Sequence, residues 1–212
     1  TIFVTSTIKG EGKTFVAFNL ALSLSTTGKK VLLIGADIRN PQLHRYIDKN
    51  IWTIGLSEYL FDNSVDIDSI TFKVKNADEQ MDLILSGRIP PNPAELLMNG
   101  RFETLINGVK NVYDYVIVDT APTLLVTDTL LISQNADTTI YVARADYTEK
   151  KLLEYPQELF RDGKLKNIAF AINGIKINNF GYGNKYGYGY GYGYGQSNGS
   201  LLKRLKNKLG LS

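Results

Sequence analysis

The residues best suited to chemistry in this chain are two glycines, a lysine and a threonine within TSTIKGEGKT, residues 5–14. Gly10 and Gly12 permit tight backbone bending, so that successive N–H groups can point at phosphate oxygens. The helix predicted behind them favours negative charge at its N-terminus. Lys13 would then reach the β- and γ-phosphates of a nucleotide, and Thr14 would hold Mg²⁺. The segment predicts a site for Mg·ATP, with an incidental lysine in a glycine-rich turn as the alternative.

This segment departs from the simplest phosphate-binding pattern. Its last three residues match the end of the Walker A motif G-x-x-x-x-G-K-[ST], but Thr7 stands where the motif has its first glycine. The partitioning-type ATPases carry an additional lysine one position later, where this chain has Ile8. Lys9 lies one position too late for that role, so we do not assign it.

Three aspartates are candidates for the carboxylates that Mg·ATP chemistry needs beside the phosphates. Asp37 follows the apolar segment VLLIGA, and Asp119 ends YVIVD in the form of a Walker B motif. Asp128 lies ahead of an apolar helical segment, where helix capping and catalysis are equally good interpretations. A capping or turn role is the alternative for the other two aspartates as well.

Apolar runs alternate with helical patterns along most of the chain, which predicts an α/β fold with a doubly wound, mostly parallel sheet of the P-loop NTPase type. Continuous apolar runs of this kind are typical of strands that are buried on both faces. The predicted strands are 2–6, 30–37, 81–87, 115–119, 138–143 and 168–172, and the predicted helices are 13–27, 92–100, 101–111 and 148–163.

Two of the predicted helices carry local signals at named residues. The helix at 92–100 has Asn92 as N-cap, Pro93 at its first position and Glu95 placed for a capping box. The helix at 148–163 is expected to be bent or interrupted at Pro156.

Composition limits the class of protein. A chain of 212 residues with 43% hydrophobic residues is long enough for one α/β domain with a full core. It has no cysteine, which excludes disulfides and thiolate metal sites, and its net charge of +3 is too small to argue for nucleic acid. We recognise no signal peptide and no apolar run of membrane-spanning length, and the opening on a strand without Met indicates an excised domain.

The packed domain is predicted to cover residues 1–178, followed by a tail at 179–212. Tyrosine and glycine alternate strictly from Tyr186 to Tyr194. Glycine at every second position makes ordering the backbone costly, so disorder is predicted. A spacer, an adhesive aromatic tract and a flap that orders on a partner remain alternatives.

The end of the tail, residues 200–212, has leucines on one face of a potential helix and basic residues elsewhere. It is interpreted either as a solvated terminal helix or as a contact with an anionic membrane surface or a phosphorylated tail.

Taken together, these segments resemble the cytoplasmic domain of bacterial tyrosine autokinases, which control capsule and exopolysaccharide export. Four segments match in order, namely STIKGEGKT (6–14) with the following NLA, VLLIGADIRNPQLH (31–44), SGRIPPNPAELL (86–97) and YDYVIVDTAPTLLVTD (113–128). GLSEYL at 55–60 and the tyrosine-rich tail also fit the family pattern.

The resemblance implies ATP-dependent phosphorylation of the C-terminal tyrosines, mainly between subunits. It implies Lys13, Asp37 and Asp119 as catalytic residues, and Thr14, Asp37 and Asp119 as Mg²⁺ ligands. The implied nucleotide-binding residues are Gly10, Glu11, Gly12, Lys13, Thr14, Phe15 and Asn173, the last placed to read the adenine edge. The implied phosphoacceptors are Tyr182, Tyr186, Tyr188, Tyr190, Tyr192 and Tyr194.

The resemblance also implies partners and a location. These are other copies of the chain, with a ring as one form of oligomer, a transmembrane activator segment on the same or another chain, and a cognate tyrosine phosphatase. The domain would lie at the inner face of the plasma membrane. The family's oligomerisation helix should precede the first strand and is absent from this chain, which again indicates truncation.

One position departs from the family pattern. The second acidic motif usually reads D-x-D, and here Gly35 replaces the first aspartate. Asp37 or Asp119 takes over its role, or the kinase is weak, or the domain is a nucleotide-dependent ATPase switch. The roles of Arg39, His44 and Arg144 stay open, since each could belong to the site or to its surroundings.

Overall fold

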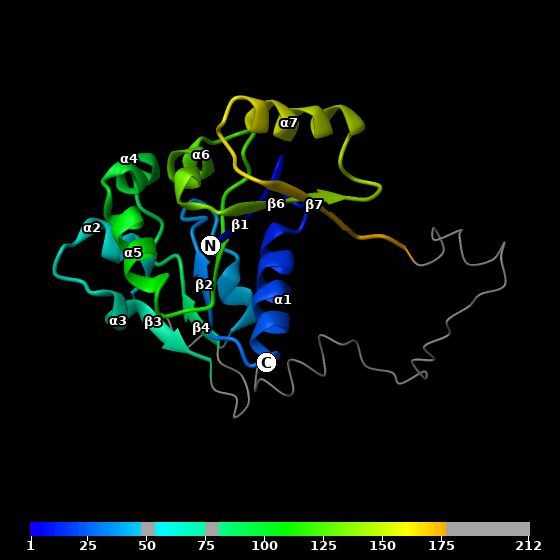
Figure 1. Ribbon diagram of the computed structural model, residues 1–212. Coiled ribbons are helices and arrows are strands. Elements are labelled where there is room, and N and C mark those ends of the chain that lie inside the picture. Colours follow the sequence, from blue (N-terminus) through cyan, green and yellow to red (C-terminus); the bar gives the residue numbers. More distant parts are fainter. Residues whose placement is uncertain (48–53, 75–80, 177–212) are drawn as a thin grey trace.

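The computed structural model describes residues 1–47, 54–74 and 81–176 (Figure 1). They form a sheet with the strand order β3-β4-β2-β5-β1-β6-β7, in which only β3 is antiparallel to its neighbour. The strands are β1 (Ile2–Ser6), β2 (Val31–Gly35), β3 (Thr71–Lys73), β4 (Met81–Ile84), β5 (Tyr115–Asp119), β6 (Thr138–Arg144) and β7 (Ile168–Asn173). The predicted fold class is confirmed.

Helices cover both faces of this sheet (Figure 1). The α-helices are α1 (Lys13–Ser25), α2 (Leu56–Phe61), α3 (Ile67–Ile70), α4 (Pro93–Met98), α5 (Arg101–Val109), α6 (Asp128–Ile132) and α7 (Glu154–Arg161). Three 3-10 turns are η1 (Leu43–Tyr46), η2 (Ser133–Asn135) and η3 (Lys150–Leu153).

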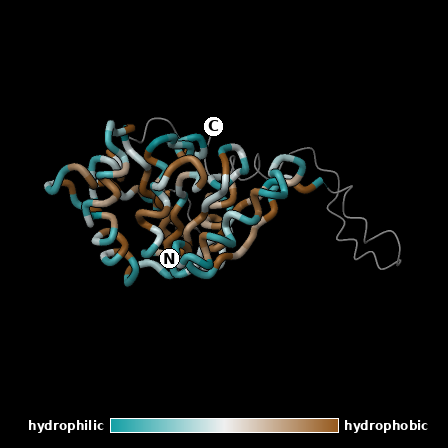
Figure 2. Tube along the Cα trace, turned by 90° about the horizontal axis from the view of Figure 1, so that it is seen from above, coloured by the Kyte–Doolittle hydropathy of each residue, from teal (hydrophilic) through white to brown (hydrophobic). Residues whose placement is uncertain are grey.

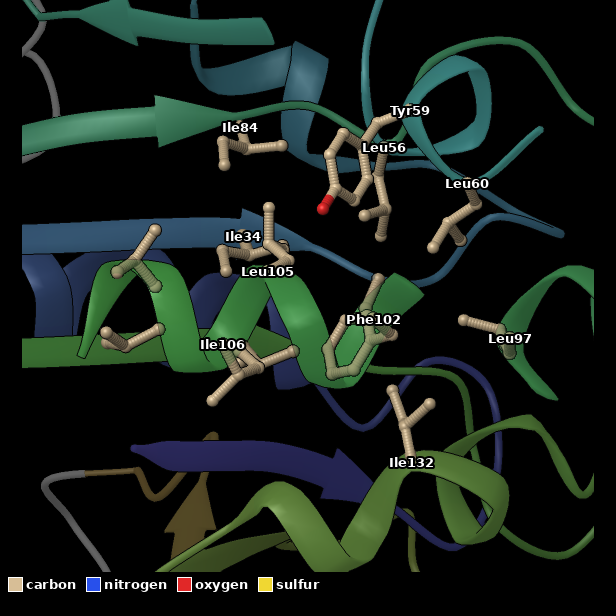
Figure 3. Close-up of a cluster of buried hydrophobic side chains, with 14 of the residues drawn as sticks. Ile34, Leu56, Tyr59, Leu60, Ile84, Leu97, Phe102, Leu105, Ile106 and Ile132 are labelled. Atoms are coloured by element: carbon tan, nitrogen blue, oxygen red, sulfur yellow. The ribbon is translucent and has the colours of Figure 1, made fainter. Parts of the chain in front are cut away.

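Two apolar clusters lie on opposite faces of the sheet, because side chains alternate along each strand. Ile34 belongs to the cluster that Phe102 and Leu105 of α5 complete, and Figure 3 shows these side chains facing one another. Leu33 belongs to the cluster that α1 completes with Phe18. From above, hydrophobic segments run through the middle of the molecule and many outer turns are hydrophilic (Figure 2).

The topology places the phosphate loop at a favourable point. β1 lies between β5 and β6. The crossover from β1 leads to β2 on one side of the sheet, and the crossover from β5 leads past β1 to β6 on the other side. In open parallel sheets, the crevice beyond the carboxyl ends of the strands at such a point is where ligands bind. The segment that joins β1 to α1 lies at this carboxyl end of the sheet.

Several local expectations need correction. The first helix, α1, ends at Ser25 and not at residue 27. Pro156 does not bend a helix, because it lies in the first turn of α7, where a missing N–H is tolerated. The change from 3-10 to α geometry falls just before Glu154. β3 was not predicted from the sequence. Its short run carries too little pattern to be recognised alone.

The start of α4 is only partly as predicted. Asn92 is the N-cap residue and Pro93 takes the first helical position. The capping box is wrong, however, because the Asn92 side chain makes no bond to the helix backbone. Its amide instead donates to the Glu95 carboxylate at 2.7 Å.

Within α5, the interior Gly108 has a packing reason. A Cβ there would lie 3.1 Å from Ile67 Cδ1, so the absence of a side chain lets α3 approach α5 closely. The predicted disordered tail and terminal helix lie outside the described residues. In the described part, every helix is too short or too polar to cross a membrane.

Candidate nucleotide site

The loop between β1 and α1 adopts the bent form that the glycines permit. Gly10 and Gly12 have φ of +92° and +97°, in the left-handed region that favours glycine. Gly12 is also the N-cap residue of α1. A Cβ at Gly12 would lie 2.1 Å from Asn173 Nδ2, so the close approach of this side chain likewise requires glycine.

The side chain of Glu11 is fully buried behind the loop rather than facing a ligand. Its carboxylate accepts hydrogen bonds from the backbone N–H of Ile8, at 2.8 Å, and from the hydroxyl of Thr148. Asn173 Nδ2 donates to the Glu11 carbonyl at 2.9 Å. The structure thus places both residues against the loop; recognition of adenine by Asn173 stays a prediction.

Two residues at the C-terminal end of β6 and just beyond it bind carbonyl groups of the loop. Arg144 donates to the carbonyl of Gly10 at 3.0 Å, and the hydroxyl of Tyr147 donates to the carbonyl of Lys9 at 3.0 Å. The Arg144 guanidinium also lies 5.2 Å from the centre of the Tyr147 ring. Arg144 therefore belongs to the surroundings of the loop. The sequence reasoning missed Tyr147 and Thr148, whose only signal is their place just beyond the C-terminal end of a predicted parallel strand.

Lys13 joins the two predicted catalytic aspartates. Its Nζ lies 2.8 Å from Asp37 Oδ2 and 3.7 Å from Asp119 Oδ1. The three side chains are 10%, 4% and 1% exposed, so this charge cluster is almost fully removed from water. Burial lowers the pKa of Lys13, but the charges of Asp119 and Asp37 outweigh it and raise the pKa overall. Lys13 is therefore a firmly charged ammonium.

Asp119 is the member of this cluster whose charged form is most opposed by its surroundings. Burial raises its pKa to about 6, although the charge of Lys13 and a hydrogen bond from Thr14 act in the opposite direction. Its Oδ1 has no hydrogen-bond partner within the described part of the chain. A buried carboxylate oxygen without a donor, beside a threonine hydroxyl, fits a hydrated divalent cation. Thr14, Asp37 and Asp119 therefore fit Mg²⁺.

A pocket of about 420 Å³ opens in front of Lys13, within the usual range for a small-molecule site. The loop and Asp37 line one side, Phe15 and Leu125 add apolar surface, and Arg45 adds positive charge. A larger cavity of about 670 Å³ lies between Lys30 and Tyr113, which precede β2 and β5. It is therefore at the other end of the strands, away from Lys13.

An ion pair links the loop after β2, which lines the smaller pocket, to the first residue of α6. The guanidinium of Arg39 donates to both carboxylate oxygens of Asp128, at 2.6 and 3.0 Å. Arg39 is 40% exposed, whereas Asp128 is 2% exposed. N-capping by Asp128 is wrong, because Thr127 is the N-cap residue of α6 and Asp128 turns to Arg39. His44 lies in η1, and its role stays open.

The unequal exposure of this pair predicts unequal effects of mutation. Arg39→Ala leaves a buried carboxylate without its donor and should cost about 2–3 kcal/mol of unfolding free energy. Asp128→Asn leaves only a guanidinium that water can solvate, so its cost should be smaller. Urea unfolding of the two variants and of the double variant tests this expectation. Equal losses in the single variants would contradict it.

The space beside Gly35 is bordered by Ser86, in the segment that follows β4. Gly35 lies opposite Asp119 in the β2–β5 register. A Cβ at Gly35 would lie 2.8 Å from Ser86 Oγ and 3.4 Å from Leu43 Cδ2. Ser86 is buried, and its carbonyl accepts hydrogen bonds from the backbone N–H and the hydroxyl of Ser57. The sequence reasoning missed Ser86, which lies some fifty residues from Gly35 along the chain.

Comparison with known proteins agrees with this geometry. A family model described as an AAA domain matches residues 1–150. AmsA of Erwinia amylovora is 36% identical over 184 residues, covering 85% of this chain and 25% of AmsA. The tyrosine-protein kinase YwqD of Bacillus subtilis is 37% identical over 178 residues, covering 83% of this chain and 73% of YwqD. A relative from Klebsiella pneumoniae, named for the cps region, is 39% identical, and the chain spans 22% of its length.

Among solved structures, the kinase domain of the Escherichia coli tyrosine kinase ETK matches with a TM-score of 0.73 and 30% identity. The match covers 91% of this chain and 71% of that one. The chain spans only a quarter of AmsA but nearly three quarters of YwqD, so its relatives differ greatly in length. This chain belongs to the bacterial tyrosine-protein kinase family, and its residues 1–150 match an AAA domain.

Proposed function

We propose that this domain is an ATP-dependent protein-tyrosine autokinase that phosphorylates its C-terminal tyrosines between subunits. Through this reaction it would regulate the polymerisation and export of a capsular or exopolysaccharide. The observation that carries the proposal is the position of Lys13. It lies at the end of a phosphate loop, between two buried carboxylates, in front of a pocket of suitable size.

The residues of the site would have different roles in phosphoryl transfer. Backbone N–H groups of the loop and the ammonium of Lys13 would orient the phosphates of ATP. Thr14, Asp37 and Asp119 would hold Mg²⁺, which supplies positive charge to the phosphate oxygens when bound. Asp37 is the candidate acceptor for the tyrosine proton. One of its oxygens already accepts a hydrogen bond from the Asn40 N–H at 3.0 Å, and the other faces Lys13.

The tail supplies the acceptors in this proposal. Tyr194 lies sixteen residues beyond Asn178, a reach of roughly 50 Å when extended, which is enough to cross to a neighbouring copy. Each phosphotyrosine would add about −1.5 to −2 charges, so phosphorylated tails would repel one another and loosen a ring or similar oligomer. A membrane-bound activator segment and a tyrosine phosphatase would complete the system at the inner face of the membrane.

Intact-mass spectrometry after incubation with Mg·ATP tests the proposal. The expected activator segment is fused to the chain, and a Lys13→Met variant runs beside it. We expect several added phosphates between Tyr182 and Tyr194, absent from the variant. ATP binding without added phosphate in the fused chain would overturn the kinase assignment.

The alternative is an ATPase switch that binds nucleotide and transfers little phosphate to tyrosine. Gly35 favours it, because the usual first aspartate is missing and a Cβ at this position would lie 2.8 Å from Ser86 Oγ. Nucleotide hydrolysis without phosphotyrosine would identify this case.

The filled space makes a prediction for restoring the family's acidic residue. Gly35→Asp should destabilise the domain by about 2–4 kcal/mol, because the new side chain meets Ser86 and buries a charge. Gly35→Asp combined with Ser86→Gly should regain much of this loss. Thermal unfolding of both single variants and the pair measures the coupling. Additive effects in this cycle would show that the two positions do not compete for space.

A further inference from the structure

Among the described residues, no strand pairs with the outer edge of β7, the last strand of the sheet. β7 ends the strand order, and its sequence, IAFAIN, contains no charged residue, proline or glycine. Natural edge strands are usually blunted by such residues or are very short. The opposite edge, β3, has only three residues and ends in Lys73. β7 therefore differs from β3 in offering a longer, uncharged edge.

Hydrogen bonds define which backbone groups of β7 are available. The N–H groups of Thr139 and Ala145 donate to the carbonyls of Asn167 and Asn173. In a parallel ladder this pattern directs the backbone groups of every second residue toward the neighbouring strand. The odd-numbered residues of β7 thus face β6, and the N–H and C=O groups of the even-numbered residues, such as Phe170, face outward.

The side chains of β7 are large on one face and small on the other. Ile168 and Phe170 lie on the face of α7, where the Phe170 ring centre is 6.0 Å from that of Tyr141. Ile172 follows on the same face by alternation. The opposite face carries Ala169 and Ala171, the latter packed against the cluster that α1 covers.

The large face forms a shallow groove with α7. Phe170 of β7 and Phe160 of α7 line the groove and are 46% and 53% exposed, and Ile172, outside the groove lining, is 52% exposed. The groove measures about 460 Å³, and Gln157 and Arg161 give it a polar rim. An aromatic ring with a hydroxyl at its far end suits such a surface, because the ring covers apolar atoms and the hydroxyl reaches polar groups.

We propose that the outer edge of β7 is the docking site for the Tyr/Gly tract of the same chain, residues 186–194. A strand of this tract has tyrosine on one face and glycine on the other. That alternation matches β7, with rings over the groove beside Phe170 and glycines beside the small face at Ala171. The backbone groups that face outward from β7 would complete the pairing, as in strand addition by other peptides.

The chain's own length supports this occupant over an unrelated peptide. The described part ends at Lys176, three residues after β7, and residues 177–185 lie between this end and the tract. A connection of this length is sufficient for the chain to turn back along β7. A short tether also gives the tract an effective concentration of about millimolar at the edge, which offsets part of the cost of ordering its glycines.

Docking has a consequence that rests on the proposed function. A tyrosine that packs against β7 is not free to enter the nucleotide pocket of a neighbouring copy. The edge would therefore hold acceptors back until a partner or the activator releases them. The docking itself requires neither ATP nor catalysis, so the two proposals are separable.

Amide hydrogen exchange of the full chain without nucleotide, followed by NMR, tests the docking. The informative amides are those of Phe170 and Ile172, which face outward, and the amide of Ala171, which faces β6, is the internal control. One variant replaces the five tyrosines of the tract by serine. A matched variant replaces them by phenylalanine, which keeps the rings and removes the acceptors.

We expect slow exchange at the two outward amides of the full chain. The serine variant should exchange there about tenfold faster or more, while the phenylalanine variant stays close to the parent chain and Ala171 is unchanged throughout. Fast exchange in the parent chain would overturn the proposal. So would protection that persists in the serine variant, which indicates another occupant, or protection that rises with protein concentration, which indicates a second copy.

Discussion

Lys13→Met should destabilise the folded domain by about 3–5 kcal/mol near pH 8, in addition to abolishing phosphate transfer. The reason is the burial of its two partners. Asp37 and Asp119 are 4% and 1% exposed, and Lys13 provides the positive charge that lies between them. Removing that charge leaves two like charges close together in a region with little water, which is much more costly than losing an exposed ion pair.

The loss should shrink as the pH falls. Lys13 is one of the groups that lower the pKa of Asp119, so the variant's Asp119 should titrate above the value of about 6 in the parent chain. A raised pKa in the folded state means that the penalty is present above this pKa and disappears as the carboxylate is protonated below it. Unfolding by urea at pH 8 and pH 5.5 measures the difference between parent and variant.

Two controls make this result specific. Lys13→Arg keeps a positive charge and should lose much less stability, and Lys13→Met with Asp119→Asn should recover part of the loss. A Lys13→Met variant as stable as the parent at pH 8 would show that the three residues are not energetically coupled. A folded control such as Lys13→Arg is also the better companion in the phosphorylation experiment.

Asp119→Asn should separate stability from function. The carboxylate is fully buried, its Oδ1 has no hydrogen-bond partner among the described residues, and burial raises its pKa. An amide of nearly the same shape removes the cost of burying a charge, and Lys13 retains Asp37 at 2.8 Å. We therefore expect an unfolding free energy within about 1 kcal/mol of the parent, or higher.

Function should change far more in this variant. With one of the two carboxylates proposed to hold Mg²⁺ made neutral, the rate of Mg²⁺-dependent phosphate transfer should fall by about 100-fold or more. Calorimetric binding of ADP with and without Mg²⁺ shows whether the loss lies in the cation site. Asp114→Asn serves as a control, because this aspartate is about half exposed and pairs with Lys29 away from the pocket. An Asp119→Asn variant with full transfer activity would remove Asp119 from the site.

The sequence predicted the parts of the site that lie on strong local patterns. Gly12 and Lys13 follow the first apolar strand, and Asp119 ends another. Because these strands are parallel, all three residues must lie at the carboxyl ends of the strands. Ser86, Tyr147 and Thr148 escaped prediction because they act through long-range packing. No local sequence pattern predicts that Ser86 will lie beside Gly35 or that Thr148 will bind Glu11.

The same limit explains the errors in local detail. Asn92 has a good partner for capping in the helix backbone and another in the Glu95 side chain, and only the three-dimensional structure decides between them. Asp128 likewise has the sequence position of a helix cap. Its carboxylate instead accepts hydrogen bonds from Arg39, which is far away in the chain.

The three bonds behind the phosphate loop fix the orientation of three consecutive peptide groups. The carbonyls of Lys9, Gly10 and Glu11 are held by Tyr147, Arg144 and Asn173. Because a trans peptide directs its N–H opposite to its C=O, the amides that follow these carbonyls are turned away from those side chains. The loop is thus preorganised: the entropy of arranging its dipoles is lost when the domain folds, and the affinity for phosphate is not reduced by that loss.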